Sequence, residues 1–341
     1  MRTIAELEAL ARERLEPAHY DYYAGGAGDE STLWANEAEF RRRVLVPRAL
    51  RRVDNRDLTT EIAGTTLALP ILVCPTAFHR LAHPDGELAT AQAAAEAGTV
   101  FTVSMASTTS VEDIAKVAAP LWFQLYPQPD REFTRAVVRR AEEAGVKALV
   151  VTVDSAVYSR RERDHRNGFL DLPPGFVAEN MRDATGQVRS IEMSGVLDWS
   201  ELDWLRSITE LPLLLKGIVH PEDARQAVEA GVAGIFVSNH GGRQLDGAIA
   251  SLAALPEVVS VVDGRVPIVL DGGVRTGSDV VKALALGADA VGIGRPVLWG
   301  LAAAGQEGVA EVLARLREET DIAMALCGAR TPRELTADLV R

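Results

Sequence analysis

The segment PIVLDGGVRTGSDVVKALALGADAVGIGRP, residues 267–296, decides the fold class. It opens with a short apolar run, continues with apolar residues at helical spacing, and closes with a second short apolar run. A glycine at position 287 follows the helical stretch, where glycine commonly stands just beyond the end of a helix. Strand, helix and strand in this order predict a parallel βαβ unit.

The same unit recurs along the chain from about residue 69. Glycine closes similar helical stretches in EAGTV, EEAGVKA and EAGVAG. Eight apolar runs accompany these stretches, each short enough for a strand buried on both faces. They are Leu69–Pro75, Thr99–Ser104, Leu121–Tyr126, Ala148–Asp154, Pro212–Gly217, Gly234–His240, Pro267–Gly273 and Ala290–Arg295. Eight runs favour an α/β fold closed as a (β/α)8 TIM barrel; a doubly wound open sheet is the competing layout.

The other segments are additions to this barrel. Residues 1–68 are expected to form an N-terminal helical extension with a short strand pair that covers the lower end of the barrel. Residues 155–210 are the longest stretch between consecutive strands and are expected to form an insert over the active site. The repeated pattern predicts that residues 1–341 form a single domain.

Composition and charge exclude several classes of protein. The net charge of -12 argues against general affinity for nucleic acid or anionic membranes. No run reaches the roughly 18 apolar residues of a membrane span, and glutamates among residues 1–20 exclude a signal peptide. Cys74 and Cys327 are far apart in the sequence, so neither a disulfide framework nor a metal site is expected. These features predict a soluble, cytoplasmic protein and leave small anions as plausible ligands.

Residues with useful chemistry stand where the predicted strands end, which is where active sites of α/β barrels are built. They are Thr76 and Ala77, Ser104, Gln124 with Tyr126, Thr152 with Asp154, Lys216, His240 with Arg243, Asp271 with Arg275, and Arg295.

The segment VSNHGGRQLD, residues 237–246, is the most informative of these ends. Its glycines let the backbone approach a ligand closely. His240 has an ordinary pKa near neutrality and suits a general base, and Arg243 can hold a carboxylate through two hydrogen bonds. The alternative is a histidine satisfied by a neighbouring carbonyl and an arginine in a surface ion pair.

The segment TVDSAVYSRRERD, residues 152–164, supplies two further candidates. Asp154 stands at a strand end, where it can orient His240 and stabilise its imidazolium form. Arg161 is a second guanidinium for a carboxylate. Arg160 and Arg163 flank it, so the sequence leaves open which arginine points inward, and a solvated basic loop is the alternative.

Lys216 ends a buried run and must meet an anion, because an unpaired buried ammonium is costly. The edge of a reduced flavin is one such anion, and an ion pair with Asp271 or Asp154 is the alternative. Glycine-containing turns with Arg275 and Arg295 follow the last two runs, where barrels commonly bind phosphate; ordinary strand-to-helix turns are the alternative.

The segment GGAGDE, residues 25–30, is also rich in glycine. It follows no predicted strand, so a loop between two helices is expected there rather than a dinucleotide-binding turn.

Taken together, these segments resemble the FMN-dependent 2-hydroxy acid oxidase and dehydrogenase family, which includes glycolate oxidase, lactate oxidase and mandelate dehydrogenases. The similar segments, in the family's order, are YDYYAGGAGDE, LPILVCPTA, FQLY, TVD, LLLKGI, SNHGGRQLD, LDGGVRTGSDVVKALALGADAVGIGRP and MALCGAR. They cover essentially the whole chain. The resemblance implies an FMN cofactor, a small 2-hydroxy acid substrate oxidised to the 2-oxo acid, O2 as acceptor giving H2O2, and a homotetramer.

The resemblance also implies roles for individual residues. His240 is the base, Asp154 the partner of its imidazolium, and Lys216 the residue at flavin N1. Arg161 and Arg243 bind the substrate carboxylate, and Tyr22 and Tyr126 contact the substrate. The implied FMN contacts are Thr76, Ala77 beside flavin N5, Ser104, Gln124, Thr152, Lys216, Ser238, Asp271, Gly273, Arg275, Gly294 and Arg295.

Departures from the family bear on the substrate. Glycolate oxidases carry a bulky aromatic residue near the SMAST segment, where this chain has Met105 and the small Ala106. The space gained is expected to be lined by Phe78 and by Tyr158 or Phe176. The segments PTAFHRLAHPDGE, WFQLY and RNGF resemble most closely the 4-hydroxymandelate oxidases. We therefore expect a mandelate-type substrate, with lactate-like aliphatic acids as the alternative.

Other functions stay open at this point. Another FMN barrel, such as an isopentenyl diphosphate isomerase or a nicotinamide-linked oxidoreductase, shares the phosphate end but lacks the His–Gly–Gly–Arg segment. A catalytically idle flavin-binding barrel is expected to have lost His240, Arg243, Arg161 or Lys216, and this chain has all of them. A dehydrogenase that passes electrons to a quinone is the third alternative. The sequence does not decide between hydride transfer and a carbanion.

Overall fold

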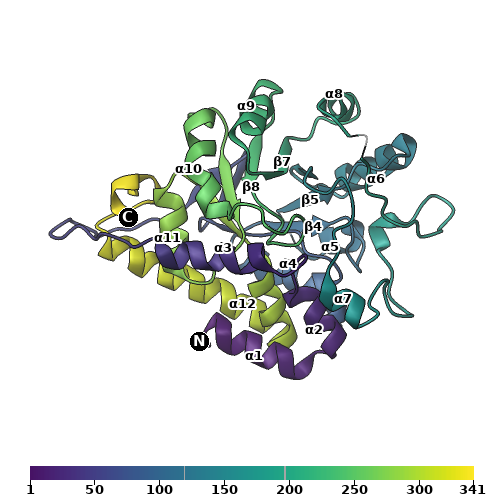
Figure 1. The fold of residues 1–341 in the computed structure, drawn as a ribbon, viewed down its shortest axis with the longest axis horizontal. Coiled ribbons are helices and arrows are strands. Elements are labelled where there is room, and N and C mark those ends of the chain that lie inside the picture. Colours follow the sequence, from purple (N-terminus) through teal and green to yellow (C-terminus); the bar gives the residue numbers. More distant parts are fainter. Residues whose placement is uncertain (119, 196) are drawn as a thin grey trace.

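The computed structural model describes residues 1–118, 120–195 and 197–341, and it confirms the predicted barrel. Eight parallel strands close in the order β10-β3-β4-β5-β6-β7-β8-β9, so each strand lies beside its neighbour in sequence. Figure 1 shows these strands at the centre of the surrounding helices, with β4, β5, β7 and β8 labelled. The strands are β3 Ile71–Val73, β4 Phe101–Ser104, β5 Leu121–Leu125, β6 Leu149–Thr152, β7 Leu213–Ile218, β8 Gly234–Val237, β9 Ile268–Asp271 and β10 Ala290–Ile293. All lie within the predicted runs except β7, which continues one residue further.

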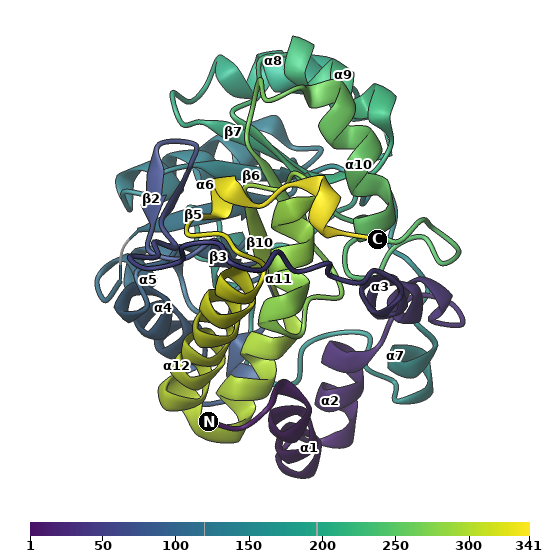
Figure 2. The same ribbon diagram turned by 90° about the vertical axis from the view of Figure 1, so that its left-hand side faces the viewer.

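Helices surround the barrel (Figure 2). Those that follow strands are α4 Gly86–Glu96, α5 Val111–Ala115, α6 Arg131–Glu143, α7 Glu162–Arg166, α8 Ser200–Arg206, α9 Pro221–Glu229, α10 Ser251–Val262, α11 Gly277–Ala285 and α12 Arg295–Leu326. Short 3-10 turns are η1 His79–Leu81, η2 Glu179–Met181, η3 Pro332–Glu334 and η4 Ala337–Leu339. Within the described residues, no helix is both long and apolar enough to cross a bilayer.

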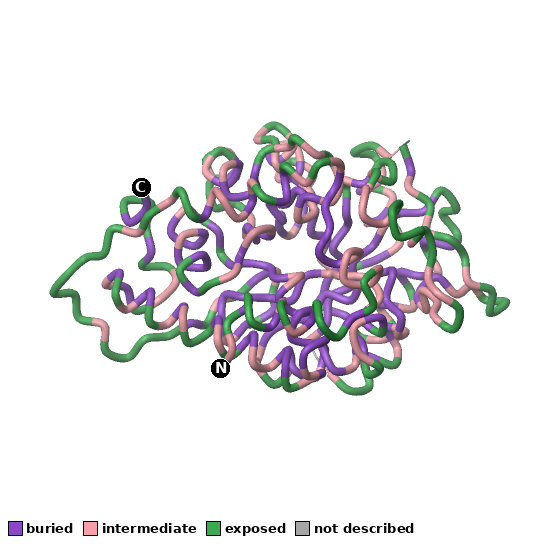
Figure 3. Tube along the Cα trace, turned by 60° about the horizontal axis from the view of Figure 1, so that its bottom comes forward, coloured by how far each residue is buried: buried purple, intermediate pink, exposed green. Residues whose placement is uncertain are grey.

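Alternation along the strands divides the buried apolar residues into two groups. One group fills the barrel interior: Leu72, Cys74, Val100, Trp122, Ala148, Val150, Leu214, Phe236, Val269 and Ala290. The larger group lies between the strands and the surrounding helices. Figure 3 shows this buried centre with exposed loops around it.

The uppermost layer of the barrel interior is polar. On five strands, a polar residue follows two positions after an apolar residue of the barrel interior. The pairs are Trp122 and Gln124, Val150 and Thr152, Leu214 and Lys216, Phe236 and Ser238, and Val269 and Asp271. Successive residues of a strand point to opposite faces, so residues two apart share one face. These side chains therefore belong to the carboxyl end of the barrel interior, and all of them are buried.

The N-terminal extension reaches both ends of the barrel. Strands β1 Thr60–Ile62 and β2 Thr65–Leu67 form an antiparallel hairpin. Ile62 and Leu67 join the interior cluster, and the Trp122 indole donates to the Thr65 hydroxyl at 3.1 Å. The hairpin thus covers the lower end of the barrel, as predicted.

The helices of the extension lie elsewhere, and to this extent the prediction for residues 1–68 was wrong. Helix α1 Ile4–Arg14 packs along α12, while α2 Pro17–Ala24 and α3 Ser31–Arg42 reach the carboxyl end. There Asn36 of α3 exchanges two side-chain hydrogen bonds with Asn239, which follows β8. The predicted helix-to-helix loop at residues 25–30 is confirmed, since it joins α2 to α3.

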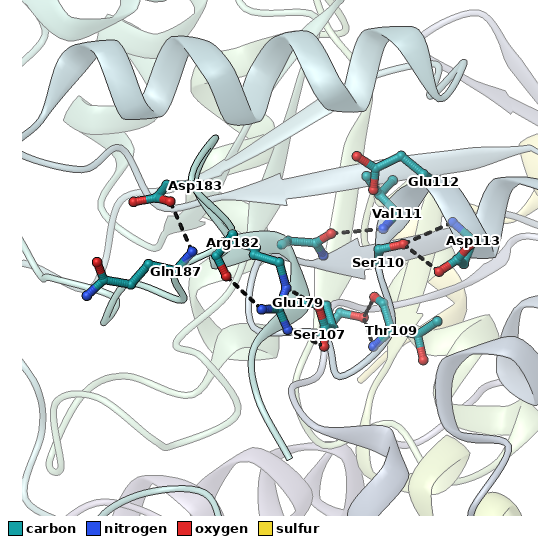
Figure 4. Close-up of polar contacts among 12 residues, drawn as sticks. Ser107, Thr109, Ser110, Val111, Glu112, Asp113, Glu179, Arg182, Asp183 and Gln187 are labelled. Carbon is teal, nitrogen blue, oxygen red and sulfur yellow. Dashed lines mark hydrogen bonds and ion pairs between the residues drawn. The ribbon is translucent and has the colours of Figure 1, made fainter. Parts of the chain in front are cut away.

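The middle of the insert between β6 and β7 is tied to the loop after β4 (Figure 4). The Glu179 N–H donates to the Ser107 carbonyl at 2.9 Å. The Asn180 side chain accepts from the Val111 N–H at 2.8 Å and donates to the Ser104 carbonyl at 3.0 Å. These bonds hold this part of the insert over the carboxyl end of the barrel.

The two ends of the insert have different neighbours. In α7, Arg163 forms ion pairs with Asp21 and Glu30 at 3.2 and 2.7 Å, which fastens the start of the insert to the N-terminal extension. In α8, Glu201 pairs with Arg131 of α6 at 2.9 Å. The start of the insert thus lies against the N-terminal extension and α8 lies against α6, and the position of residues 155–210 over the active site stays a prediction. Residue 196 of this range lies outside the described residues.

Candidate active site

A cavity opens at the carboxyl ends of the strands and has a volume of about 710 Å³, its open mouth included. The predicted site residues that line it are Thr76, Lys216, His240, Arg243, Asp271, Gly273, Arg275, Gly294 and Arg295. The other predicted residues are not part of this lining. They are Tyr22, Ala77, Ser104, Gln124, Tyr126, Thr152, Asp154, Arg161 and Ser238.

His240 lies in the loop after β8, where its backbone adopts a left-handed conformation with φ of +60°. Its N–H donates to the Ser238 hydroxyl at 3.1 Å. Nδ1 lies 2.9 Å from Asp154 Oδ1, and Nε2 lies 3.5 Å from the Tyr126 hydroxyl. Because a carboxylate only accepts, Nδ1 carries the proton and donates it to Asp154. Nε2 is then the basic atom, and it points towards Tyr126.

The charges around His240 and Asp154 suit a role of His240 as a base. Burial lowers the pKa of His240 below its ordinary value, although Asp154 opposes the shift. Burial acts to raise the pKa of Asp154, but His240 and Lys216 together bring it below the ordinary value. Burial also raises the pKa of Tyr126 to about 12, so its hydroxyl keeps its proton. At neutral pH the site therefore holds a neutral imidazole beside a carboxylate.

Two guanidiniums meet beside this pair. Arg243 lies over the Tyr22 ring at 5.0 Å, and its Nη1 donates to the carbonyls of Tyr22 and Gly25 at 2.6 and 2.8 Å. Arg161 Nε donates to the Arg243 carbonyl at 3.5 Å, and its Nη1 lies 3.8 Å from Asp164 Oδ2. Burial, and then the charge of Arg161, lower the pKa of Arg243 to about 10. A ligand carboxylate at this point relieves the repulsion between the two cations.

The structure resolves which arginine of the insert points inward. Arg160 pairs with Glu162 at the surface, and Arg163 is held by Asp21 and Glu30. Arg161 alone of the three contacts Arg243.

Lys216 is buried and bonded on two sides. Its Nζ donates to the Ser238 hydroxyl at 2.9 Å and lies 3.2 Å from Asp271 Oδ2. Burial acts to lower the pKa of Lys216, but Asp271 and Asp154 together raise it above the ordinary value. The ion pair with Asp271, one of the two interpretations left open by the sequence, is present. Since Lys216 also lines the cavity, its charge remains available to a ligand.

The polar upper layer of the barrel fits the ring of FMN. Gln124 Nε2 and Thr152 Oγ1 are buried and have no hydrogen-bond partner among the residues that the structure describes. Such orphaned atoms are rare in native proteins unless a ligand or water satisfies them. Thr152 is paired in register with Lys216 across β6 and β7, so both flank one region. The polar edge of a flavin would offer partners for both atoms.

The loops after β9 and β10 fit the phosphate of FMN. Gly273 has φ of +89°, and a Cβ there meets the Asn36 carbonyl oxygen at 2.5 Å, so only glycine fits. Gly294, which precedes α12, has no side chain to cap the first N–H groups of that helix. Burial, and then the charges of Arg243 and Arg275, lower the pKa of Arg295 well below its ordinary value. An anion at this end offsets that repulsion.

Some residues of the site were missed by the sequence analysis. Tyr23 lines the cavity and donates its buried hydroxyl to the Phe78 carbonyl at 2.6 Å. Cys74 also lines the cavity and approaches Asp271 at 3.6 Å; its place two residues after the interior Leu72 signalled this position. Asn239 stands beside His240, but its pairing with α3 had no signal in the sequence.

Aromatic rings gather beside the two arginines. Tyr22 stacks on Phe78 with centroids 5.6 Å apart and packs on Phe169 at 5.1 Å. The Phe78 N–H donates to the Ala106 carbonyl at 3.2 Å, so the small Ala106 lies next to this cluster. The expectation for Phe78 fits this arrangement, and Phe169 was missed.

For the other two expected lining residues, the structure gives contacts outside the aromatic cluster, and their place beside the substrate stays a prediction. Tyr158 is 63% exposed and donates its hydroxyl to the Ile191 carbonyl at 2.5 Å. The Phe176 ring lies under the Arg80 guanidinium at 5.6 Å.

Comparison with known proteins identifies the family of the chain. The profile of a family described as FMN-dependent dehydrogenase matches residues 11–341. An L-lactate oxidase of Nostoc sp. is 50% identical, over 95% of this chain and 93% of that protein. A glycolate oxidase of Spinacia oleracea is 47% identical, over 98% and 94%. The structure of a mandelate oxidase with (S)-2-phenylpropionate is 44% identical and superposes with a TM-score of 0.92, over 99% and 97% of the chains.

Proposed function

The chain belongs to the FMN-dependent dehydrogenase family, and on this premise we propose that it is an oxidase of aromatic 2-hydroxy acids of the mandelate or 4-hydroxymandelate type. FMN is its cofactor, and its reaction is the oxidation of a 2-hydroxy acid to the 2-oxo acid. We further propose that O2 reoxidises the flavin and leaves as H2O2. The observation that carries the aromatic assignment is the cluster of Tyr22, Phe78 and Phe169 beside Arg243 and the small Ala106.

In this proposal the substrate is held through its carboxylate. Arg161 and Arg243 bind the carboxylate, with Tyr22 and Tyr126 beside it. Holding one end of the substrate in this way fixes its α-carbon next to the base. The two guanidiniums are close and Arg243 is half-buried, which supports a shared anionic ligand.

His240 is proposed to accept a proton from the substrate at Nε2. Its Nδ1–H bond to Asp154 fixes the tautomer, and the carboxylate stabilises the imidazolium that forms. FMN, when bound, accepts the two electrons. Lys216 supplies a positive charge at the edge of the ring that becomes electron-rich.

The remaining contacts with FMN are proposals of the same kind. Gln124 Nε2 and Thr152 Oγ1, which have no partner within the described residues, are proposed to form hydrogen bonds with the flavin ring. Arg275, Arg295 and the N-terminus of α12 are proposed to bind the phosphate. The other proposed contacts are Thr76, Ala77, Ser104, Ser238, Asp271, Gly273 and Gly294.

Replacing Ala106 with phenylalanine tests the aromatic assignment. The new ring fills the space beside Phe78, so kcat/KM for mandelate is expected to fall about 10- to 200-fold, while that for glycolate changes little. Steady-state oxidation of mandelate, 4-hydroxymandelate, lactate and glycolate measures the change, and Ala106→Ser is the small control. A variant that loses activity on all four acids equally contradicts the assignment.

An aliphatic 2-hydroxy acid is the second candidate substrate. It is favoured by the 50% identity with an L-lactate oxidase. A kcat/KM for lactate above those for both mandelates in the unaltered protein decides in favour of this candidate.

The pH dependence of activity tests the pairing of His240 with Asp154. Only the neutral imidazole accepts a proton, so kcat/KM is expected to fall on the acid side as pH drops through the His240 pKa. Burial holds this pKa below the ordinary 6.5, although Asp154 acts to raise it. Asp154→Asn removes the raising influence, so the acid limb moves to lower pH.

The kcat of Asp154→Asn is expected to be roughly 100-fold lower than that of the unaltered protein, because the His240 imidazolium loses its counter-charge. Asp198→Asn, a change at a surface residue that caps α8, is the control. An acid limb that stays in place or moves to higher pH contradicts the pairing.

A further inference from the structure

His79 is a buried histidine that the proposed reaction does not use. It lies in the turn after β3 and is 0% exposed, and both of its ring nitrogens are bonded to threonines. Nε2 is 2.5 Å from the hydroxyl of Thr76, which lines the cavity. Nδ1 is 2.9 Å from the hydroxyl of Thr90 in α4. A continuous chain of hydrogen bonds thus runs from α4 to the wall of the cavity.

The imidazole of His79 is neutral in this setting. Burial lowers its pKa, and this outweighs the opposing charge of Glu87. The Glu87 carboxylate is satisfied by other groups: it accepts from the backbone N–H of His79 at 3.0 Å and from the backbone N–H and hydroxyl of Thr108 at 2.7 and 2.9 Å. A neutral imidazole has one donor and one acceptor nitrogen, so its two threonine partners must play opposite roles.

The direction of the chain follows from its far end. The Thr90 hydroxyl donates to the Gly86 carbonyl at 3.4 Å, one helical turn earlier. Its single hydrogen can serve either that carbonyl or His79 Nδ1 at 2.9 Å; we take the first arrangement, in which the Thr90 oxygen accepts from His79 Nδ1–H, and the tautomer measurement below tests it. Nε2 then has no hydrogen and accepts from the Thr76 hydroxyl. With its own hydrogen directed at His79, the Thr76 oxygen offers the cavity lone pairs alone.

We propose that His79 is a positioning residue that makes Thr76 an acceptor-only contact for FMN and thereby favours the reduced cofactor. Two-electron reduction adds a hydrogen to a flavin ring nitrogen, which changes that atom from an acceptor into a donor. Thr76 directly precedes Ala77, the residue proposed to lie beside flavin N5. An oxygen that only accepts matches the reduced ring and is mismatched with the oxidised one. The inference rests on the proposed contact between Thr76 and FMN.

Thr90→Val tests the direction of the chain. In this variant the Thr90 oxygen is gone, so a hydrogen on His79 Nδ1 would be a buried donor without a partner. Leaving that donor unpaired costs more free energy than leaving Nδ1 as an unpaired acceptor. The hydrogen is then expected on Nε2, bonded to the Thr76 oxygen, so that the Thr76 hydroxyl donates into the cavity. Thr320→Val is a matched control, because Thr320 is also buried in a helix and donates to the carbonyl one turn earlier, at Leu316.

Two measurements on the FMN-loaded protein read out the change. Nitrogen NMR of 15N-histidine-labelled protein, with His79 assigned from His79→Gln, is expected to show the Nδ1–H tautomer in the unaltered chain and the Nε2–H tautomer in Thr90→Val. The ratio of FMN affinities, reduced over oxidised, is expected to fall about tenfold in Thr90→Val, equivalent to a midpoint potential about 30 mV lower. Thr320→Val is expected to leave both unchanged.

The outcomes separate the inference from its premise. An Nε2–H tautomer in the unaltered protein, or an unchanged potential in Thr90→Val, overturns the role of His79. If Thr76→Val also leaves the potential and FMN affinity unchanged, the contact of Thr76 with FMN is wrong as well. If Thr76→Val shifts the potential while Thr90→Val does not, FMN lies where proposed and the inference alone fails.

Discussion

Replacing His240 with asparagine is expected to lower kcat for mandelate about 10³- to 10⁴-fold while FMN stays bound, the upper part of the range for loss of a general base. His240 Nε2 is the proposed proton acceptor, and asparagine has no basic nitrogen to replace it. Asparagine is the better choice for this position because it tolerates the left-handed backbone, with φ of +60°, at lower cost than alanine. The loss of activity then reports chemistry rather than strain.

The measurement for His240→Asn combines steady-state turnover with the visible absorption of the bound flavin. We expect a yellow protein that mandelate fails to bleach under anaerobic conditions, and the same result for His240→Ala. His220→Asn is the control, since that histidine caps α9 at the surface. Turnover within tenfold of the unaltered protein refutes the role of His240 as base.

Replacing Arg161 with methionine is expected to lower kcat/KM for mandelate about 10²- to 10³-fold. A charge-assisted hydrogen bond contributes about 1.5–3 kcal/mol, and an arginine makes up to two with one carboxylate. Arg243 then faces the substrate alone, with part of its guanidinium already bonded to backbone carbonyls. Methionine keeps most of the volume of the side chain without its charge.

The neighbouring arginine supplies the control for this variant. Arg160→Met removes the same charge from a surface pair with Glu162, so its kcat/KM is expected to stay within about twofold. A substrate analogue with an amide in place of the carboxylate separates charge recognition from general damage. The preference for mandelate over mandelamide should shrink in Arg161→Met alone. An equal loss in both variants contradicts the inward position of Arg161.

The barrel and half of the residues of its cavity wall were predictable from the sequence because they depend on local patterns. A strand of four to six residues alternates between two faces, so a polar residue two positions beyond an interior apolar one must face the upper end of the barrel. Gln124, Thr152, Lys216, Ser238 and Asp271 all follow this pattern. Glycine after several of the helices marks where the chain turns back into the next strand.

Features set by contacts between distant segments were not predictable. Helix α3 lies at the carboxyl end because Asn36 pairs with Asn239, two residues that no sequence pattern links. Arg161 points inward because Arg163 is already held by Asp21 and Glu30. The identity of the third aromatic residue, Phe169, depends on how α7 packs on α2, so nearby Tyr158 and Phe176 were equally plausible from the sequence.

The most direct test is to mix the FMN-loaded protein with (S)-mandelate in the absence of oxygen and follow the flavin spectrum. If His240, Arg161 and Arg243 bring one aromatic 2-hydroxy acid to the flavin, the yellow colour bleaches rapidly, faster than with glycolate, and returns when air is admitted. A flavin that stays oxidised with mandelate and 4-hydroxymandelate contradicts the proposed substrate, and one that stays reduced in air contradicts the proposed use of O2.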